Sequence, residues 1–516
     1  MKKHRNTKRA DGSIRWFGLS VGLAILFAGL WLAGRFPYSG AHYGFWSLVP
    51  PIVALALAFL LRDVVAALFM GIVLGGVITD RLNVVQEFFI PSLGTTSFAG
   101  ILIVYLWALG GLIGLWTRTG GARVFADAAS RRLVRGPRSA KLFAWVMGLV
   151  FHQGGSISTV LTGATVRPVA DRQRVSHEEL SYIVDSTGSP AATLIPFNVW
   201  PIYVASLVAG TVPILATEQE AIRFFWHAIP FNFYAIFAVL LTFLLAYERV
   251  PIPMGRQMRE AISRARTTGE LDRPGSDPLA AEELTEVRVP AGYEPGLVDF
   301  LGPMVTLLGV VILPFIVTFF LQGNRADPSL PVFEAFVLAV LVAMAIALAK
   351  GMALRDVMDG FISGCKGVTI GAIVIALSVT LKSVADALGT APYVVQALGE
   401  TMPAAALPAL LLVFTMFIAF STGTSWGTFA VFFPVAMPLV WAVYPDPTYL
   451  ALCFGAVVGG SVFGDQCSPI SDTTILSSLS TGSDLMDHVR TQIPMSLLAA
   501  GLAAVVYTGI GWFLTS

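Results

Sequence analysis

Charged residues are scarce in this chain of 516 residues, because Asp, Glu, Lys and Arg together make up only 13% of it. Soluble domains carry about 25% charged residues, so the composition excludes an ordinary soluble protein. The formal net charge is +1, which offers no excess of positive charge for binding nucleic acid. Apolar residues are abundant, at 55%. The composition predicts an all-α, polytopic membrane protein embedded in a lipid bilayer.

Cysteine is also scarce. Cys365, Cys453 and Cys467 have a spacing that matches neither a disulfide framework nor a zinc site. The sequence contains no metalloprotease-type HExxH motif and no comparable catalytic constellation. We therefore expect neither an enzyme nor a bound cofactor.

Apolar runs of roughly 20 residues recur along the chain and predict about 11 membrane-spanning helices. They cover residues 16–34, 45–61, 63–79, 98–117, 180–210, 225–247, 298–321, 331–349, 366–387, 449–480 and 493–514. The basic N-terminus, MKKHRNTKRA, precedes an apolar run that is longer than the core of a cleaved signal peptide. We expect a retained first helix, a cytoplasmic N-terminus and a location in the cell (plasma or inner) membrane.

Two further apolar segments, 141–166 and 403–443, do not fit this count. Basic residues flank the first segment on both sides: Arg131, Arg132, Arg135, Arg138 and Lys141 before it, and Arg167, Arg172 and Arg174 after it. Because basic flanks stay in the cytoplasm, the segment is predicted to enter the membrane and return as a re-entrant hairpin, with HQGGS (152–156) at its tip. The second segment has acidic or neutral flanks and a polar centre, FSTGTSWGT (420–428), which predicts a matching hairpin entered from outside.

With these hairpins the chain divides into two corresponding halves. A basic N-terminus and first helix (1–44) precede repeat 1 (45–248), which holds the first hairpin and a broken helix at 180–210. A polar cytoplasmic linker (249–297) leads to repeat 2 (298–516), which holds the second hairpin and a broken helix at 449–480. An odd number of crossings separates the matching segments, so the repeats are predicted to be inverted, with a binding site near the membrane midplane.

Polar residues gather at the four segments that such a site would use. The first tip offers Ser156, Ser158 and Thr159, and the first broken helix offers Asp185, Ser186, Thr187, Ser189 and Asn198 around Pro190. The second tip offers Ser421, Thr422, Thr424 and Ser425. Their oxygens and the freed carbonyls would coordinate a cation, whereas half-helix N-termini would hold an anion. His152 has two open interpretations, a proton relay or a hydrogen bond within the tip.

The most polar of the four is FGDQCSPISDTTILSS (463–478), which lies in sequence apolar enough for a membrane. Pro469 breaks this helix between Asp465 and Asp472. The segment offers Asp465, Gln466, Ser468, Asp472 and Thr473. Hydrocarbon does not tolerate such a cluster unless it is buried, lines a cavity or binds something. Oxygen ligands suit sodium, so we predict a sodium site formed by Asp465, Ser468, Asp472 and Asp185. One buried carboxylate that carries the cation and a proton in turn is the simplest exchange mechanism.

Two other polar groups have structural interpretations. Lys382 and Asp386 lie four residues apart near the end of a predicted helix, so we expect an internal ion pair. Asp487, His488 and Arg490 follow the last broken helix, and we expect them at the cytoplasmic surface.

GDQCSPISDTTILSS followed by DHVRTQIP (487–494) closely resembles the signature of the NhaC-type sodium/proton antiporters. FSTGTSWGT (420–428) and the segment 165–190, which ends in DSTGSP, resemble two other motifs of that family. The resemblance covers nearly the whole chain. It implies an ion-transporter-superfamily architecture: a homodimer with two re-entrant hairpins, in which a transport domain moves like an elevator against a scaffold.

Two functions are consistent with this resemblance. The first is a secondary sodium/proton antiporter, in which sodium and protons are the coupling ions and Asp465, Asp472 and Asp185 carry them. The second is a sodium- or proton-coupled carrier, or exchanger, of a small organic carboxylate or amino acid. Where relatives have acidic residues at the first hairpin tip, this chain has HQGGS. That difference removes carboxylate ligands facing Asp185 and leaves room for an organic anion.

Overall fold

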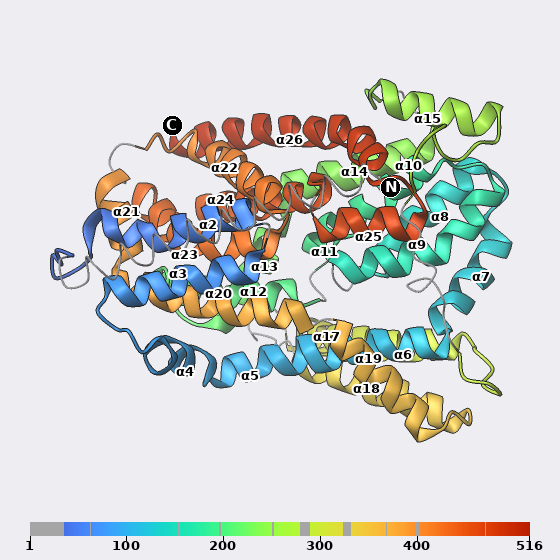
Figure 1. Cartoon of the computed structure of the whole chain (residues 1–516), viewed down its shortest axis with the longest axis horizontal. Coiled ribbons are helices and arrows are strands. Elements are labelled where there is room, and N and C mark those ends of the chain that lie inside the picture. Colours follow the sequence, from blue (N-terminus) through green and yellow to red (C-terminus); the bar gives the residue numbers. More distant parts are fainter. Residues whose placement is uncertain are drawn as a thin grey trace, which may run out of the picture.

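The computed structural model of the chain is built from helices joined by short turns (Figure 1). The structure describes residues 36–61, 63–152, 155–195, 198–249, 252–278, 289–322, 332–367, 369–398, 402–469 and 471–516, and these residues contain no β-strand. The predicted first helix, 16–34, lies outside the described residues.

Eighteen described helical segments precede the linker, and fourteen of them come before residue 209. They are η1 (Gly44–Leu48), α2 (Val49–Leu61), α3 (Val64–Ile78), η2 (Val85–Phe89), α4 (Ile90–Leu93), α5 (Thr96–Leu102), η3 (Ile103–Leu109), α6 (Gly110–Thr119), α7 (Gly121–Leu133), α8 (Pro137–Val150), α9 (Gly155–Arg172), α10 (His177–Ser186), α11 (Ser189–Leu194) and α12 (Trp200–Val208). They are followed by η4 (Pro213–Leu215), α13 (Glu218–Ala228), η5 (Ile229–Phe231) and α14 (Phe233–Tyr247).

The linker contains one described helix, and the second half of the chain follows it. The elements are α15 (Arg256–Thr267), α17 (Val298–Gln322), α18 (Val332–Ala349), α19 (Leu354–Gly367), α20 (Thr369–Leu388), α21 (Thr390–Leu398), α22 (Leu407–Thr422), α23 (Ser425–Val443), α24 (Pro447–Cys467), α25 (Asp472–Thr481) and α26 (Leu485–Thr515).

Three helices of the described residues are long and apolar enough to span a membrane: α23, α24 and α26. Two bent pairs raise the number to five if each pair is one span, and several shorter apolar helices accompany them. The structure therefore divides many predicted spans into shorter pieces. The predicted span 98–117, for example, consists of α5, the π-helix η3 and α6. Integral membrane character follows from these apolar helices, but a count of 11 spans does not.

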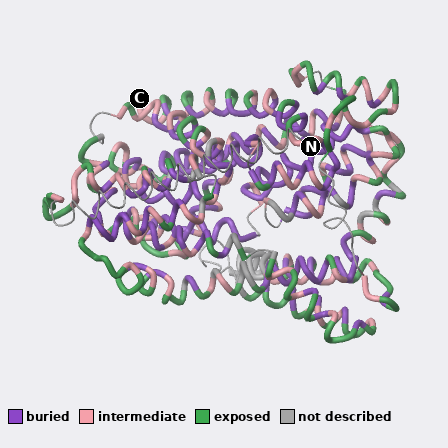
Figure 2. Tube along the Cα trace, in the orientation of Figure 1, coloured by how far each residue is buried: buried purple, intermediate pink, exposed green. Residues whose placement is uncertain are grey.

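The helices α24 and α26 illustrate how burial is distributed. Residues of α24 are buried on all sides, whereas α26 lies along the outside of the molecule, where exposed and buried residues alternate along it (Figure 2). Its exposed residues include the large apolar Val505 and Phe513. A helix that is apolar on every face must lie inside the protein or contact lipid. The polar end of α24, which contains Asp465, is therefore placed at the centre of the protein.

The helices pack in two groups that share few elements. In one group α2, α3 and α20 contact one another, α6 packs on α19, and α17 packs on α18. In the other, α8 to α11 and α14 pack with α22 and α24 to α26. Figure 1 shows α6, α17, α18 and α19 along one side of the molecule, with α26 on the opposite side. The two predicted hairpins and both broken helices belong to the second group, where α23 also packs on α12 and α20.

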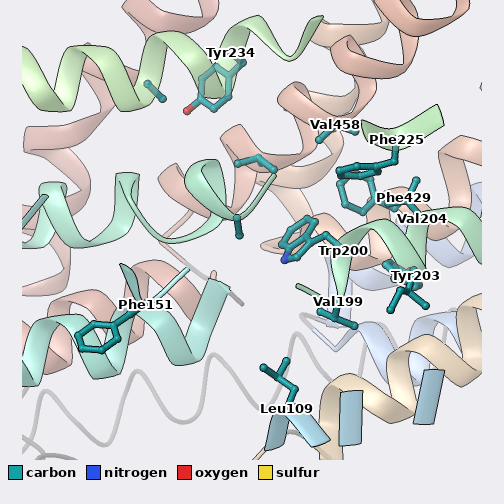
Figure 3. Packing of buried hydrophobic residues seen from close by; sticks show 14 of the residues in the cluster. Leu109, Phe151, Val199, Trp200, Tyr203, Val204, Phe225, Tyr234, Phe429 and Val458 are labelled. Atoms are coloured by element: carbon teal, nitrogen blue, oxygen red, sulfur yellow. The ribbon is translucent and has the colours of Figure 1, made fainter. Parts of the chain in front are cut away.

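Each segment predicted as a hairpin consists of two helices joined by a short turn. α8 and α9 meet at residues 151–154, of which the structure describes Phe151 and His152, and α22 and α23 meet at Gly423 and Thr424. The second helix of each pair contacts the broken helix of the other half: α9 packs on α25, and α23 packs on α12. Figure 3 shows the second of these contacts, where Trp200 and Tyr203 of α12 face Phe429 of α23. Each half of the chain therefore packs, through the second helix of its hairpin, against the broken helix of the other half.

The predicted ion pair on α20 is confirmed, since Lys382 Nζ lies 3.1 Å from Asp386 Oδ2. It lies apart from both breaks and serves below as a reference for a carboxylate outside the site.

Candidate functional site

The second broken helix is interrupted at its most polar stretch. α24 ends at Cys467 and α25 begins at Asp472, with Ser468, Pro469 and Ser471 described between them. The last carbonyls of a helix have no partners within that helix. Here the hydroxyls of Thr473 and Thr474 both donate to the Asp465 carbonyl oxygen at 2.8 Å. The start of α25 therefore stabilises the open end of α24, and the break is a fixed feature of the fold.

The Asp465 side chain lies at the tip formed by α22 and α23. Ser425, the first residue of α23, donates its backbone N–H to Asp465 Oδ1 at 2.7 Å, and its hydroxyl donates to Oδ2. Only 2% of Asp465 is exposed. The N-terminus of a helix carries partial positive charge and favours an anion. The Ser425 N–H and the first turn of α23 are therefore placed to stabilise a negative charge on Asp465.

The tip between α8 and α9 contacts the same site through Gly155, the first residue of α9. A methyl group on Gly155 would lie 2.6 Å from Ser189 Oγ and 3.0 Å from Thr473 Cγ2. Only glycine fits so close a contact, which brings the tip against both breaks, at the start of α11 and at the start of α25. The Ser189 hydroxyl is buried and has no hydrogen-bond partner within the described residues. It is therefore available to a bound ligand.

Asp185, on the first broken helix, contacts a residue of α26. Asp185 is fully buried, and its Oδ2 lies 3.1 Å from His488 Nε2 on α26. The same imidazole nitrogen lies 3.1 Å from the Ser477 hydroxyl on α25. Asp185 Oδ1 and His488 Nδ1 have no partner within the described residues, and Gln492 and Thr474 lie beside the carboxylate. A buried acid and base in contact form a group that can gain and lose a proton.

A hydrogen-bonded bridge through Gln466 joins the two broken helices. The Gln466 amide N–H donates to Ser186 Oγ at 2.7 Å, and the Tyr234 hydroxyl donates to Gln466 Oε1 at 2.6 Å. Tyr234 comes from α14, and Figure 3 shows its hydroxyl pointing away from the apolar cluster around Trp200. Both ends of the Gln466 amide are thus engaged, so Gln466 and Ser186 fix the spacing of the breaks.

Several predicted site residues donate hydrogen bonds from their hydroxyls to backbone carbonyls of the same helix or tip. The Thr187 hydroxyl donates to the Ile183 carbonyl at 2.7 Å, and the Thr422 hydroxyl donates to the Ile418 carbonyl at 2.9 Å, in the way that helical threonines commonly do. The Ser158 hydroxyl donates to the Phe151 carbonyl at the first tip. These hydroxyls stabilise the tips and helix ends, and we do not include them among the ligands proposed below.

Asn198 also has a local structural role. Its amide donates to the Ala192 and Ile195 carbonyls at 2.7 Å, and its oxygen accepts the Trp200 N–H at 2.9 Å. These bonds hold the loop between α11 and α12, which is a second interruption that the sequence pattern did not predict.

The remaining predicted residues lie near the breaks in different ways. Ser468 is buried and Asp472 is exposed, and both have interactions of their own. Thr159 is buried on α9, where its carbonyl accepts a hydrogen bond from Ser480 Oγ at 3.1 Å, and Thr424 directly precedes α23. The side chains of Ser156 and Ser421 lie outside the described part of the structure.

His152 lies in the first tip, nearly buried. Its Nδ1 lies 2.8 Å from the Leu149 carbonyl, while Nε2 has no partner within the described residues. The bond to Leu149 matches the structural interpretation of this residue, and the free Nε2 leaves the proton-relay interpretation open.

His488 is the residue that the sequence interpretation missed. The expectation that it lies at the surface is wrong, because its side chain is fully buried against Asp185. The reason is that α26 begins at Leu485 and directs His488, Gln492 and Ser496 inward, one helical turn apart. That four-residue spacing of polar residues in an apolar helix was the available signal. Its neighbour Asp487 faces the linker, where Arg273 lies 3.0 Å away.

The apolar helices and the polar breaks buried among them define an integral membrane transporter. The fold is similar to that of the Alcanivorax borkumensis YdaH transporter, with a TM-score of 0.54 over 84% of this chain and 90% of that one. The identity is only 14%, so this similarity concerns the fold alone.

The sequence profile of the Na+/H+ antiporter family matches residues 200–512, and the chain belongs to that family. The family consists of antiporters, which places the chain among transporters rather than enzymes.

Curated relatives span a range of transported species. A Haemophilus influenzae protein is 29% identical over 478 residues, covering 90% of this chain and 91% of the relative. The malate-2H(+)/Na(+)-lactate antiporter of Bacillus subtilis is 29% identical over 231 residues, 44% of this chain and 45% of the relative. The Na(+)/H(+) antiporter NhaC of Alkalihalophilus pseudofirmus is 28% identical over 212 residues, 41% and 44% of the two chains.

Proposed function

We propose that this protein is a secondary antiporter that exchanges sodium ions for protons across the cell membrane. The observation that carries the proposal is Asp465, a buried carboxylate held by the N-terminus of α23 at the point where a helix break and a tip meet. An intramembrane acid in such a place marks an ion pathway in membrane proteins.

The proposed sodium site consists of oxygen atoms around the two breaks. Asp465 provides the charge, and Ser468, Asp472 and Thr473 lie within eight residues of it across the break of its own helix. Gly155 brings the first tip and the free hydroxyl of Ser189 against Thr473. Sodium is a hard cation that prefers such oxygen ligands. Sodium is here the transported substrate and not a resident cofactor.

The proposed proton site is the pair formed by Asp185 and His488. Their contact is buried between α10 and α26, and Ser477 orients the imidazole. Protonation of one partner changes the charge of the pair, and Asp185 lies near enough to Asp465 for the two carboxylates to interact. Loss of the proton therefore places more negative charge near the sodium site and favours sodium binding. This interaction is the proposed coupling between the two ions.

The proposed movement follows the two packing groups. Both breaks, both tips and α26 belong to one group, which would move as a transport body against the helices α2, α3, α6 and α17 to α20. Inverted repeats, re-entrant hairpins, elevator movement and a homodimer form one consistent proposal, with the N-terminus in the cytoplasm. The packing of α9 on α25 and of α23 on α12, each between one half of the chain and the other, supports this proposal.

A second function is favoured by the first tip. Gly155 and Ser189 bring no carboxylate to the site, and the buried Ser189 hydroxyl is free to bind an oxygen of an organic molecule. The Bacillus subtilis relative exchanges malate and lactate with coupled ions. The alternative is therefore a sodium- or proton-coupled exchanger of a small organic carboxylate or amino acid, with sodium held by Asp465.

Proteoliposomes that contain the full chain and a trapped pH dye test the proposal. An imposed sodium gradient should drive proton movement without any organic solute, and Asp465→Asn should abolish it. Asp386→Asn is the matched control, because it removes a carboxylate from the ion pair with Lys382 outside the site. Proton movement that appears only when a carboxylate or amino acid is added would instead establish the second function. Unchanged exchange by Asp465→Asn would overturn the role of Asp465 in either one.

A further inference from the structure

Residues 252–278 of the linker are docked on the transport body. Arg264 Nη2 lies 2.8 Å from both carboxylate oxygens of Glu178 on α10. Arg273 Nε lies 3.0 Å from Asp487 on α26, and the Asp277 N–H donates to Asp484 at 2.9 Å. We call this docked segment the linker cover. Its positive side chains face acidic groups at the N-terminal ends of two helices, so its attachment is built from complementary charge.

Apolar and steric contacts accompany the ion pairs. Met258, Ala261 and Ala265 form the buried face of α15. A methyl group on Gly255 would lie 3.0 Å from Pro494 Cγ on α26. Figure 1 shows α15 at one end of the molecule, beside α10. The linker cover is therefore packed against the body along α15 as well as held by charge at its end.

The two helices that hold the linker cover also hold the proposed proton site. α10 carries Glu178, which binds the cover, and Asp185 two turns further along; α26 carries Asp487, which binds the cover, and His488 next to it. The linker cover consequently spans the ends of α10 and α26 on the side of Asp185 and His488 that is predicted to be cytoplasmic.

His177 is the central attachment of the linker cover. Its Nδ1 lies 2.8 Å from Asp272 of the linker, and its Nε2 lies 3.2 Å from Asp171 on α9. Its backbone N–H donates to the Leu271 carbonyl at 3.2 Å. Only 6% of the side chain is exposed. An imidazole between two carboxylates binds both when it is protonated, and it can donate to only one of them when it is neutral.

We propose that the linker cover closes access to Asp185 and His488 from this face, and that loss of the His177 proton in alkaline medium releases it and raises the transport rate. The effect on the transport rate rests on the proposed function. The docking of the linker cover does not, because it is independent of the transported species.

The sign of the pH effect follows from the partners of His177. Burial lowers the pKa of His177, but the hydrogen bonds to Asp171 and Asp272 outweigh it and raise the pKa to about 9. The raised pKa means that the stabilisation is complete below the ordinary histidine pKa of about 6.5 and is lost as the pH rises through about 9. Between pH of about 7.5 and 9.5, docking is expected to weaken roughly twenty-fold by linkage.

The other charged groups at this interface do not produce the same effect. On α10 these are Glu178 and Glu179. On α9 Arg167 lies 3.6 Å from Asp171, and Arg174 follows the end of that helix. From the linker come Arg264, Arg266, Glu270 and Arg273; from α8 and α14, Lys141 and Glu248; and from α26, Asp484 and Asp487. Arginines stay protonated throughout this range. Nearby Arg266 and Lys141 keep the pKa of Glu248 low despite its partial burial, and backbone hydrogen bonds do the same for Asp484. His177 is therefore the group placed to respond in alkaline medium.

Trypsin cleavage at the exposed arginines of α15, such as Arg256, measures docking of the full chain without any transport. Asp272→Asn should be cleaved faster than the wild-type protein at pH of about 7.5, by up to about twenty-fold because Asp171 still contacts His177, and His177→Arg should stay protected at pH of about 9.5. Variants are compared at the same pH, so that the pH dependence of trypsin cancels. Asp386→Asn, which removes a carboxylate from the ion pair with Lys382 on α20, outside the linker cover, is the matched control and should behave as wild type.

Transport rates of the same proteins in proteoliposomes complete the test. Asp272→Asn should run faster than wild type at neutral pH and lose its acceleration in alkaline medium. Equal cleavage of wild type and Asp272→Asn would overturn the docking role of His177, and fast cleavage without a faster rate would overturn the closure of access. If the wild type exchanges no sodium for protons, the proposed function fails, while the cleavage arm still decides whether the linker cover is released.

Discussion

The contact between α22 and α24 offers a direct test of how the fold positions Asp465. A methyl group on Gly464 would lie 2.2 Å from the Ala419 carbonyl carbon, 2.3 Å from Ala419 Cβ and 2.4 Å from the Phe420 nitrogen. Ordinary van der Waals contact begins at 3.4 Å. Gly464→Ala therefore requires α22 to withdraw by about 1 Å, because a backbone cannot rotate away as a side chain does.

The magnitude follows from that displacement. Overpacking of a close contact typically costs about 1–3 kcal/mol, and a backbone clash belongs at the upper end of that range. α22 leads directly into the tip that carries Ser425, whose N–H lies 2.7 Å from Asp465. A shift of about 1 Å carries this contact beyond hydrogen-bond distance. We expect a less stable protein that also binds sodium more weakly.

Thermal unfolding in detergent and radioactive sodium binding measure the two effects. Gly501→Ala on α26 is the matched control, because an added methyl group there meets nothing within 4 Å. It should be neutral or slightly stabilising, since alanine favours a helix over glycine by about 1 kcal/mol. If Gly464→Ala unfolds at the same temperature as Gly501→Ala and binds sodium equally well, the tip does not depend on this contact and our reasoning is refuted.

Three further predictions concern charge. Ser425→Ala removes one of two donors to Asp465 and should weaken sodium binding about ten-fold or more in a binding assay, since a hydrogen bond to a charged group contributes about 1.5–3 kcal/mol; unchanged affinity would contradict the proposed site. Lys141→Met removes the nearer cation from the buried Glu179, at 2.8 Å, and leaves Arg266 at 3.4 Å, so it should destabilise the protein by about 3 kcal/mol, the lower end of the range for a broken buried pair, in unfolding experiments. Asp386→Asn, which breaks a partly exposed pair with Lys382, should change stability by less than about 1 kcal/mol, and a larger loss would show that the pair is structural.

The membrane class and the polar breaks could be predicted from the sequence. Their signals are local: apolar runs need only composition, and Pro469 breaks α24 wherever that helix lies. The same holds for Lys382 and Asp386, since residues four apart on one helix are always neighbours. The second interruption, between α11 and α12, was not predicted because its stability comes from Asn198, which has no distinctive sequence signature in an apolar segment.

The linker shows how a polar, breaker-rich sequence can still pack. Its composition predicts a solvated connection, yet α15 docks through Arg264 and Arg273 onto carboxylates more than eighty residues away in the sequence. Composition reports how well a segment is solvated, but it carries no information about a complementary surface elsewhere on the chain.

The sequence by itself determined that this protein crosses a membrane, that helices break at Asp185 to Ser189 and at Asp465 to Asp472, and which family it belongs to. These properties depend on neighbouring residues and on motifs. Only the tertiary structure decided which carboxylate meets which partner: Asp465 meets Ser425 of the second tip, whereas Asp185 meets His488 of α26. The reason is that the packing of whole helices selects the partner, and residues 303 positions apart carry no information about that packing in their local sequences.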